Sequence, residues 1–225
     1  LEEGFSYYQK NLLAHYNVDV FCHSWNTHLN DKILELYNPV DYKFENYKFS
    51  TEHDEIYSHC NIHHTSPPRY SLAQFYSVFQ TRDMKSEYEL KNNFTYDWVI
   101  KARYDYALNF VINFETLDLS KIHLPIRKYV HPDGTYDKGF CDLFGFGSSY
   151  NMNKYMSVYE FIDHFSSVPN FKFFGEHLLS STLMLHGLRD RYNYPAGENE
   201  QVTFVDMNDP FIGYPEENGR KWVYS

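Results

Sequence analysis

Three charged side chains follow a short apolar stretch near the middle of the chain. Residues 98–100 (Trp-Val-Ile) have the aromatic and β-branched character of a buried strand, and Lys101, Arg103 and Asp105 come after them at alternate positions. Because side chains alternate between faces in an extended strand, we expect these three groups on one face. Ligands of α/β proteins bind beyond the carboxyl ends of strands. An ion pair that merely closes the strand end fits the same pattern, so the residues alone leave both interpretations open.

Two more carboxylates stand at positions that suit chemistry. Asp142 is embedded in the aromatic stretch 140–147, where a charge must find hydrogen-bond donors or change its pKa. Glu176 follows Gly175 at the predicted start of a helix, a good position for a general base that faces a cleft. The helix dipole alone also explains an acid at that position.

A polar loop is predicted between residues 52 and 68, and it is rich in potential zinc ligands. These are His53, His59, Cys60, His63 and His64. Their spacing matches no zinc finger, so a mobile loop is the favoured interpretation and a zinc hydrolase ranks third among the functions considered.

Composition narrows the function classes. The 225 residues suffice for one domain with a substantial core, and the net charge of −10 argues against a nucleic-acid partner. The 22 tyrosines and 19 phenylalanines suit both a core and a cleft that stacks on sugars. No apolar run is long enough to span a membrane. Three scattered cysteines favour a reducing compartment, and we expect the protein in the cytoplasm, or in the host cytoplasm if it is viral.

The elements that position these residues are predicted from periodicity. A strand, a helix and a strand at 18–25, 31–37 and 42–49 suggest a βαβ unit and a largely parallel sheet. The other predicted elements are helices at 2–16, 71–91 (with Ser71 as N-cap and a break before its end), 149–164 and from 176 onward, a short element at 118–125 that ends at a proline, strands at 140–147 and 201–205, a turn at 131–134 and an irregular tail from 189 to 225. Gln74 faces away from the strongest part of the apolar stripe of its helix and could reach a ligand, but a solvated side chain is the favoured expectation.

Four motifs, taken in order with an aromatic helix between the first and the second, resemble bacterial and viral glycosyltransferases of the GT-A fold, including the WavE-like polysaccharide-synthesis proteins. They are Asp-Val-Phe-x-His-x-Trp (19–25), Tyr-Asp-Trp-Val-Ile-x-x-Arg-x-Asp (96–105), Asp-x-Phe-x-x-Gly (142–147) and Gly-Glu (175–176), so the similarity spans about 19–182. The resemblance implies one GT-A-like α/β domain over 1–225, with a mostly parallel central sheet flanked by helices. It also implies transfer of a sugar from a nucleotide-sugar donor to a glycan or another hydroxyl acceptor.

The resemblance also implies residue roles. Asp105 takes the place of the Asp-x-Asp motif and reaches a divalent cation, Mn²⁺ or Mg²⁺, while Arg103 and Lys101 lie near the nucleotide. Glu176, or else Asp142, is the base. Because position 103 is an arginine, only one carboxylate of the usual pair is present. The family's first strand and nucleotide-contacting loop would precede Leu1. A non-catalytic carbohydrate- or protein-binding domain that keeps this fold is the alternative function.

Overall fold

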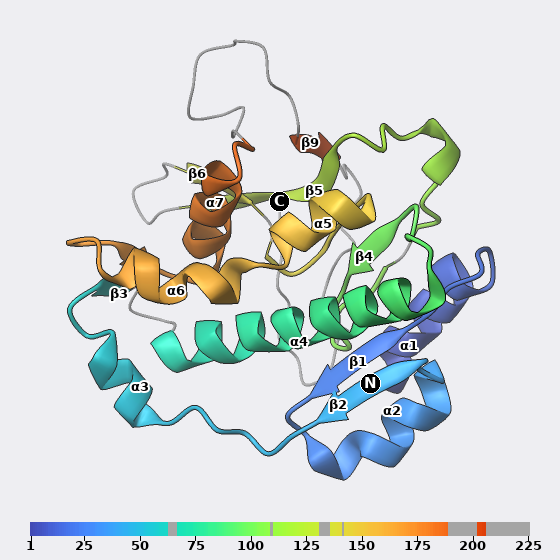
Figure 1. Cartoon of the computed structure of the whole chain (residues 1–225), viewed down its shortest axis with the longest axis horizontal. Coiled ribbons are helices and arrows are strands. Elements are labelled where there is room, and N and C mark those ends of the chain that lie inside the picture. The colour runs from blue at the N-terminus through green and yellow to red at the C-terminus, as the bar shows by residue number, and fades with distance from the viewer. Residues whose placement is uncertain (63–66, 109, 131–135, 141, 189–201, 206–225) are drawn as a thin grey trace.

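The structure is a computed structural model that describes residues 1–62, 67–108, 110–130, 136–140, 142–188 and 202–205. It has a mixed α/β architecture. The long helix α4 (Pro68–Asn92) crosses the middle of the molecule, with β1, β2 and α2 on one side and α5, α6 and α7 on the other (Figure 1). Within the described residues, no helix combines the length and the apolar character that a membrane span needs.

The N-terminal part contains the predicted βαβ unit. Its elements are α1 (Glu2–Tyr8), which continues as a π-helical segment η1 (Gln9–Leu13), then β1 (Phe21–Ser24), the 3₁₀ turn η2 (Thr27–Leu29), α2 (Asn30–Tyr37) and β2 (Asp41–Phe44). β1 and β2 pair in parallel, with Phe21 opposite Asp41, as predicted. Both strands are shorter than predicted. α2 ends at Asn38, which takes the left-handed conformation (φ 40°) that asparagine tolerates better than most residues.

The predicted polar loop after β2 is partly helical, which corrects the expectation. Helix α3 (Thr51–Ile56) begins after a capping box at Ser50. In this cap the Ser50 amide donates to His53 Nδ1 at 3.1 Å. Glu52 and Asp54 in the first turn complement the helix dipole. After α3, β3 (Asn61–Ile62) pairs in parallel with β8 (Lys172–Phe173).

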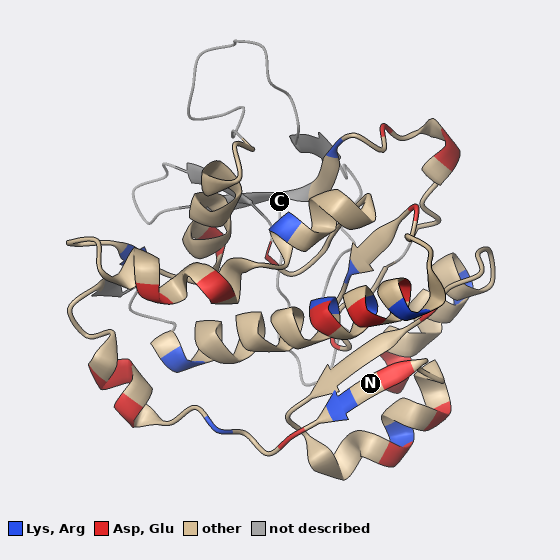
Figure 2. Ribbon diagram, viewed as in Figure 1, with Lys and Arg blue, Asp and Glu red and all other residues tan. Residues whose placement is uncertain are grey.

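Helix α4 starts three residues before the predicted N-cap. Pro68 occupies its first turn, where the missing amide proton is no loss, and Ser71 is a buried helical residue instead. Charged residues gather in the C-terminal half of α4, whereas its N-terminal half is almost uncharged (Figure 2). The uncharged half packs into the core, and it carries Gln74.

The larger sheet is mostly antiparallel, so the predicted mostly parallel central sheet is wrong here. Its strands are β4 (Val99–Lys101), β5 (Ile122–Val130), β6 (Tyr136–Phe140), β7 (Gly145–Gly147) and β9 (Val202–Val205). The order is β4-β7-β5-β6, each pair antiparallel, and only β9 joins β5 in parallel. The β5–β6 pair has a simple physical reason: a parallel neighbour needs a crossover of a dozen or more residues, and only residues 131–135 separate these two strands. The predicted turn at 131–134 lies outside the described residues.

The remaining elements are η3 (Phe114–Thr116), α5 (Ser149–Tyr155), α6 (Val158–Ser166) and α7 (Gly175–Leu185). The predicted single helix at 149–164 therefore breaks at residues 156–157. One core lies between α4 and α5 to α7, around Phe75, Phe173 and Leu179. A second core packs Tyr8 and Leu12 against Tyr106, Phe144 and Phe146, and thereby ties the N-terminal helix to the chain that follows β4.

Candidate functional site

The predicted charged pair lies in a turn directly after β4. The strand ends at Lys101, and the Tyr106 amide donates to the Arg103 carbonyl oxygen at 3.3 Å. Arg103 Nε and Nη2 bond the two carboxylate oxygens of Asp105 at 2.8 and 2.7 Å. Tyr8 donates its hydroxyl to the Arg103 carbonyl at 3.1 Å, so α1 anchors the turn. The Arg103 and Asp105 side chains are 32% and 49% exposed, which leaves the pair accessible to a ligand.

The electrostatics of this pair keep Asp105 ionised. Burial by itself raises the pKa of Asp105. The hydrogen bonds and charge of Arg103, with a smaller contribution from Lys101, outweigh that effect and hold the pKa below its usual value. At neutral pH the pair is therefore an arginine cation held against a carboxylate anion.

Lys101 does not share a face with Arg103 and Asp105, which corrects the prediction from strand alternation. Its side chain is buried, and its ammonium donates to the carbonyl oxygens of Asp142 and, at 2.9 Å, of Leu143. The extended chain stops at Lys101, so the alternation does not continue through the turn. Lys101 thus fastens the end of β4 to the segment that leads into β7.

Asp142 is buried, and Gln74 connects it to the charged pair. Gln74 Nε2 donates to the Asp142 carboxylate Oδ2 at 2.9 Å and to the Asp142 carbonyl oxygen at 3.2 Å. On its other side, Gln74 Oε1 accepts from Arg103 Nη1 at 3.4 Å. The expectation that Gln74 is solvated was wrong. Its place in the uncharged half of α4, directly between buried Ala73 and Phe75, was the signal in the sequence.

The Asp142 carboxylate also lies against the start of α7. A β-carbon at Gly175 would collide with Asp142 Oδ2, so the two segments meet at the first residue of the helix. The next residue, Glu176, is partly buried at this junction. The structure therefore brings Arg103, Asp105 and Asp142 together with the start of α7, although these residues come from three separate parts of the sequence.

The Asp105 carboxylate suits a divalent cation that binds together with a phosphate-containing ligand. This half-exposed group is the hard oxygen donor that Mg²⁺ prefers, and this ion commonly uses only one or two carboxylates together with substrate phosphates and water. In the described part of the chain no three His, Cys, Asp or Glu residues gather into a metal site. Of the predicted histidine loop, His53 caps α3 and His59 bonds the Ser166 carbonyl at 2.8 Å, whereas His63 and His64 lie outside the described residues.

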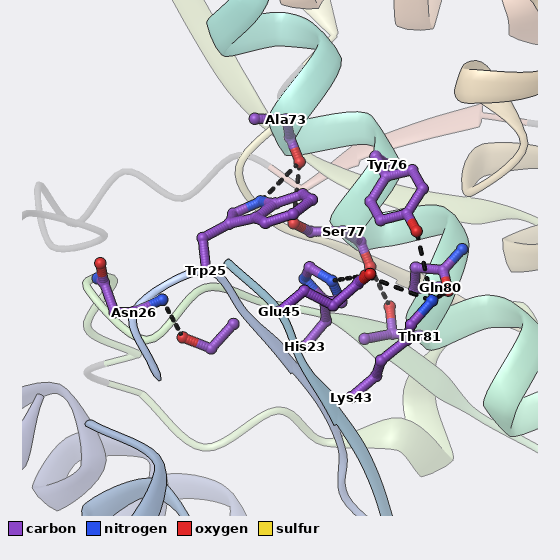
Figure 3. Close-up of polar contacts among 11 residues, drawn as sticks. His23, Trp25, Asn26, Lys43, Glu45, Ala73, Tyr76, Ser77, Gln80 and Thr81 are labelled. Carbon is purple, nitrogen blue, oxygen red and sulfur yellow. Dashed lines mark hydrogen bonds and ion pairs between the residues drawn. The ribbon is translucent and has the colours of Figure 1, made fainter. Parts of the chain in front are cut away.

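A second polar cluster, which the sequence analysis missed, fixes α4 to the parallel strands (Figure 3). His23 at the end of β1 bonds Glu45 Oε1 through Nε2 at 3.1 Å. Lys43 donates to Gln80 Oε1 at 2.6 Å and to the Tyr76 hydroxyl at 3.3 Å. Figure 3 shows these residues of β1, β2 and α4 pointing toward one another. The signal was present as alternation in β2, because Lys43 and Glu45 lie on the same face of the strand.

The same cluster reaches the residue next to Gln74. Trp25 Nε1 donates to the Ala73 carbonyl oxygen at 3.3 Å, and the Trp25 ring packs on Tyr76 with centroids 5.3 Å apart (Figure 3). Burial lowers the pKa of His23 despite the nearby Glu45 carboxylate, so the imidazole is neutral at pH 7. This contact sets the position of the helical turn that carries Gln74.

Comparisons with known proteins place the chain in one family. Neither the curated proteins nor the solved structures give a significant match. Residues 4–193, most of the chain and all of the candidate site, match the family DUF7796, described as a domain of unknown function, and the chain belongs to that family.

Proposed function

We propose that the protein is a glycosyltransferase that moves a sugar from a nucleotide-sugar donor to a glycan or another hydroxyl acceptor, on a GT-A-like fold. One observation carries this proposal: the Arg103–Asp105 pair, Asp142 and the Gly175–Glu176 helix start converge through Gln74. The parallel β1–α2–β2 unit supports the fold part of the proposal. So does a strand, β4, that ends just before the charged pair.

The donor end of the site is the charged pair. Transfer from a nucleoside diphosphate sugar builds up negative charge on the leaving diphosphate, and preorganised cations stabilise that charge. Arg103 offers a planar fork of donors that suits phosphate oxygens. Asp105 would hold Mn²⁺ or Mg²⁺, which, when bound, supplies further positive charge against the diphosphate. Lys101 acts indirectly, because its ammonium holds the Asp142 segment.

The acceptor end is the start of α7. An acceptor hydroxyl needs a group that takes its proton, and Glu176 at the helix start is that base. Asp142, buried beside Gly175, carries negative charge where the helix dipole favours it, and it holds Gln74. In this proposal Glu176 meets the acceptor and Asp142 organises the site around it.

Binding of nucleoside diphosphates tests the proposal directly. A ligand that binds only the folded state at 100 times its Kd raises the free energy of unfolding by about 2.7 kcal/mol. We therefore expect at least one of UDP, GDP, CDP or ADP, with Mn²⁺, to raise the melting temperature. Release of a sugar from the matching donor should follow. No shift with any of the four would overturn the proposal.

The same experiment separates the alternative function. A carbohydrate- or protein-binding domain that has kept the fold but lost donor binding would be stabilised by none of the four nucleotides and would release no sugar from the donor. In the proposed enzyme, donor hydrolysis or transfer accompanies nucleotide binding, and the Asp105→Asn variant loses it.

A further inference from the structure

The side-chain amide of Gln74 has only one orientation that satisfies its neighbours. Its nitrogen donates twice to Asp142, to Oδ2 at 2.9 Å and to the carbonyl oxygen at 3.2 Å. Both of these atoms are acceptors, so a flipped amide would set an oxygen against two oxygens. The amide oxygen must then face the other way, where Arg103 Nη1 donates to it at 3.4 Å.

This contact completes the fixation of the Arg103 guanidinium. Asp105 accepts from Nε and Nη2, and Gln74 accepts from the third nitrogen. A planar fork held at all three nitrogens keeps its direction better than one without the Nη1 contact, because the Asp105 side chain that binds Nε and Nη2 is itself half exposed. The direction of the fork decides how well it meets phosphate oxygens.

The backbone that carries Gln74 is itself rigid. Its neighbours Ala73 and Phe75 are 6% and 2% exposed, and Trp25 bonds the Ala73 carbonyl at 3.3 Å. Residues that hold a site are effective when they stand on a packed element rather than on a loop. The Arg103 turn, in contrast, is half exposed and depends on contacts such as those of Gln74 and Tyr8.

We infer that Gln74 is the positioning residue of the site: it locks the Arg103 fork to the Asp142 carboxylate and thereby sets the affinity for a diphosphate. The inference rests on the proposed function, because it takes the Arg103 end as the place where the diphosphate binds. The inference adds to the site a residue that lies outside the four motifs. It also means that diphosphate binding at Arg103, the donor end, depends on Asp142 at the acceptor end.

The first experiment measures diphosphate affinity by calorimetry with pyrophosphate, UDP and GDP, each in Mn²⁺. Gln74→Met keeps the size of the side chain and removes both sets of hydrogen bonds. We expect about tenfold weaker binding, equivalent to about 1.4 kcal/mol. The matched control is Gln80→Met, on the same helix, where Gln80 bonds Lys43 instead. The control should bind within about twofold of the wild type.

A second variant provides a readout that a purely structural glutamine would not move. Gln74→Glu introduces a carboxyl within hydrogen-bond distance of Asp142 Oδ2, where a second negative charge is disfavoured, so the introduced carboxyl keeps its proton to a higher pH than a free glutamate does. Within the described residues, the charged groups bonded to this position or to its partners include Asp142, Arg103 with its partner Asp105, and Lys101 at the Asp142 carbonyl. The ratio of the diphosphate affinity of Gln74→Glu to that of the wild type should be near one at pH 5, because the protonated carboxyl can still donate a hydrogen bond to Asp142. The ratio should fall toward pH 8, where the carboxyl has lost its proton.

The outcomes are distinct. Wild-type affinity in Gln74→Met, or a ratio for Gln74→Glu that does not change with pH, overturns the inference and leaves the proposed function standing. If the wild type binds neither pyrophosphate nor UDP nor GDP, the inference and the proposed function both fail. Should Gln74→Met not fold, as judged by circular dichroism, the Gln74→Glu comparison decides alone, because it contrasts two pH values in one protein.

Discussion

The Asp142 carboxylate lies so close to Gly175 that any other residue at position 175 would place its β-carbon on Oδ2. This close approach joins a buried acid after β6 to the start of α7, two segments that are far apart in the sequence. It also explains the glycine without any need for an unusual backbone angle, because the space itself excludes a side chain. The acceptor end of the proposed site therefore depends on this close approach.

Gly175→Ala should disturb this contact. Overpacking of a tight site costs about 1–3 kcal/mol, so we expect a loss of that size in the free energy of unfolding, together with a loss of transfer. A double-mutant cycle with Asp142→Ala is the check by urea denaturation. Because the second substitution removes the atom that collides, the double variant should be more stable than the sum of the two losses predicts. Simple additivity would mean that the two residues do not press on each other.

Asp105→Asn should separate the two proposed roles of the charged pair, cation binding by Asp105 and diphosphate binding by Arg103. The amide keeps the shape but not the charge, so dependence of diphosphate binding on Mn²⁺ and sugar transfer should both be lost. Arg103, however, is released from an ion pair that is about half exposed, and such pairs contribute about 0.2–1 kcal/mol. Asparagine, however, accepts from only one Arg103 nitrogen and fixes the fork less well, so the two effects oppose each other and pyrophosphate binding in EDTA should change little. Calorimetry measures both, and an unchanged response to Mn²⁺ would show that Asp105 holds no cation.

Arg103→Lys should weaken diphosphate binding about tenfold while the protein stays folded. An ammonium keeps the charge, but it cannot bond both Asp105 oxygens and Gln74 at once as the planar fork does. The matched control is Arg82→Lys, because Arg82 also binds carboxylates, those of Asp83 and Glu160, at another position on α4. Equal affinities for pyrophosphate in the two variants would remove Arg103 from the binding site.

Acid should destabilise the protein through His23. The pKa of His23 is lower in the folded protein than its ordinary value of about 6.5, so the unfolded chain binds more protons in acid. The contribution of His23 is therefore fully present above about pH 6.5 and is lost as the pH falls through the folded pKa. Burial also lowers the pKa of three other histidines, His123, His177 and His186. These residues therefore add to the loss of stability in acid.

Urea denaturation between pH 7 and pH 5 measures this effect. His23→Gln can still donate to Glu45 but does not titrate, so its free energy of unfolding should decline less steeply than that of the wild type. His28→Gln, which removes an exposed histidine, is the matched control and should follow the wild type. Equal slopes for wild type and His23→Gln would show that this imidazole is as easily protonated in the fold as outside it.

Local sequence patterns predicted many of the helices and strands, because hydrophobic periodicity and turn-forming residues depend only on positions close together in the sequence. The βαβ unit, the α4 and α7 helices and the strand at 202–205 follow from such signals. Strand direction in the larger sheet did not, since the same short apolar runs fit parallel and antiparallel neighbours. α3 was missed because its helix signal lies in a cap, Ser50 with His53, and not in an apolar stripe.

The site was predictable in part for a similar reason. Motif order marked Arg103, Asp105, Asp142 and Glu176, but the turn that starts after Lys101 broke the alternation on which the placement of Lys101 depended. Gln74 was passed over because an amide on a helix has no spacing partner nearby. Its partners lie 29 and 68 positions away, and only the folded chain brings them together.

Glu176 is the proposed base, and kinetics can separate that role from a purely electrostatic one at the start of α7. If it is only an acid that complements the helix dipole, it contributes about 0.3–1 kcal/mol to stability and nothing to transfer. If it is the base, Glu176→Gln should slow transfer about 10²–10⁴-fold at unchanged nucleotide affinity, with little change in melting temperature. Glu160→Gln, on α6, removes a comparable surface carboxylate and is the matched control. We expect the first result from steady-state kinetics with saturating donor. Transfer within a few-fold of the wild type would instead leave Asp142, buried against Gly175, as the remaining carboxylate at the acceptor end.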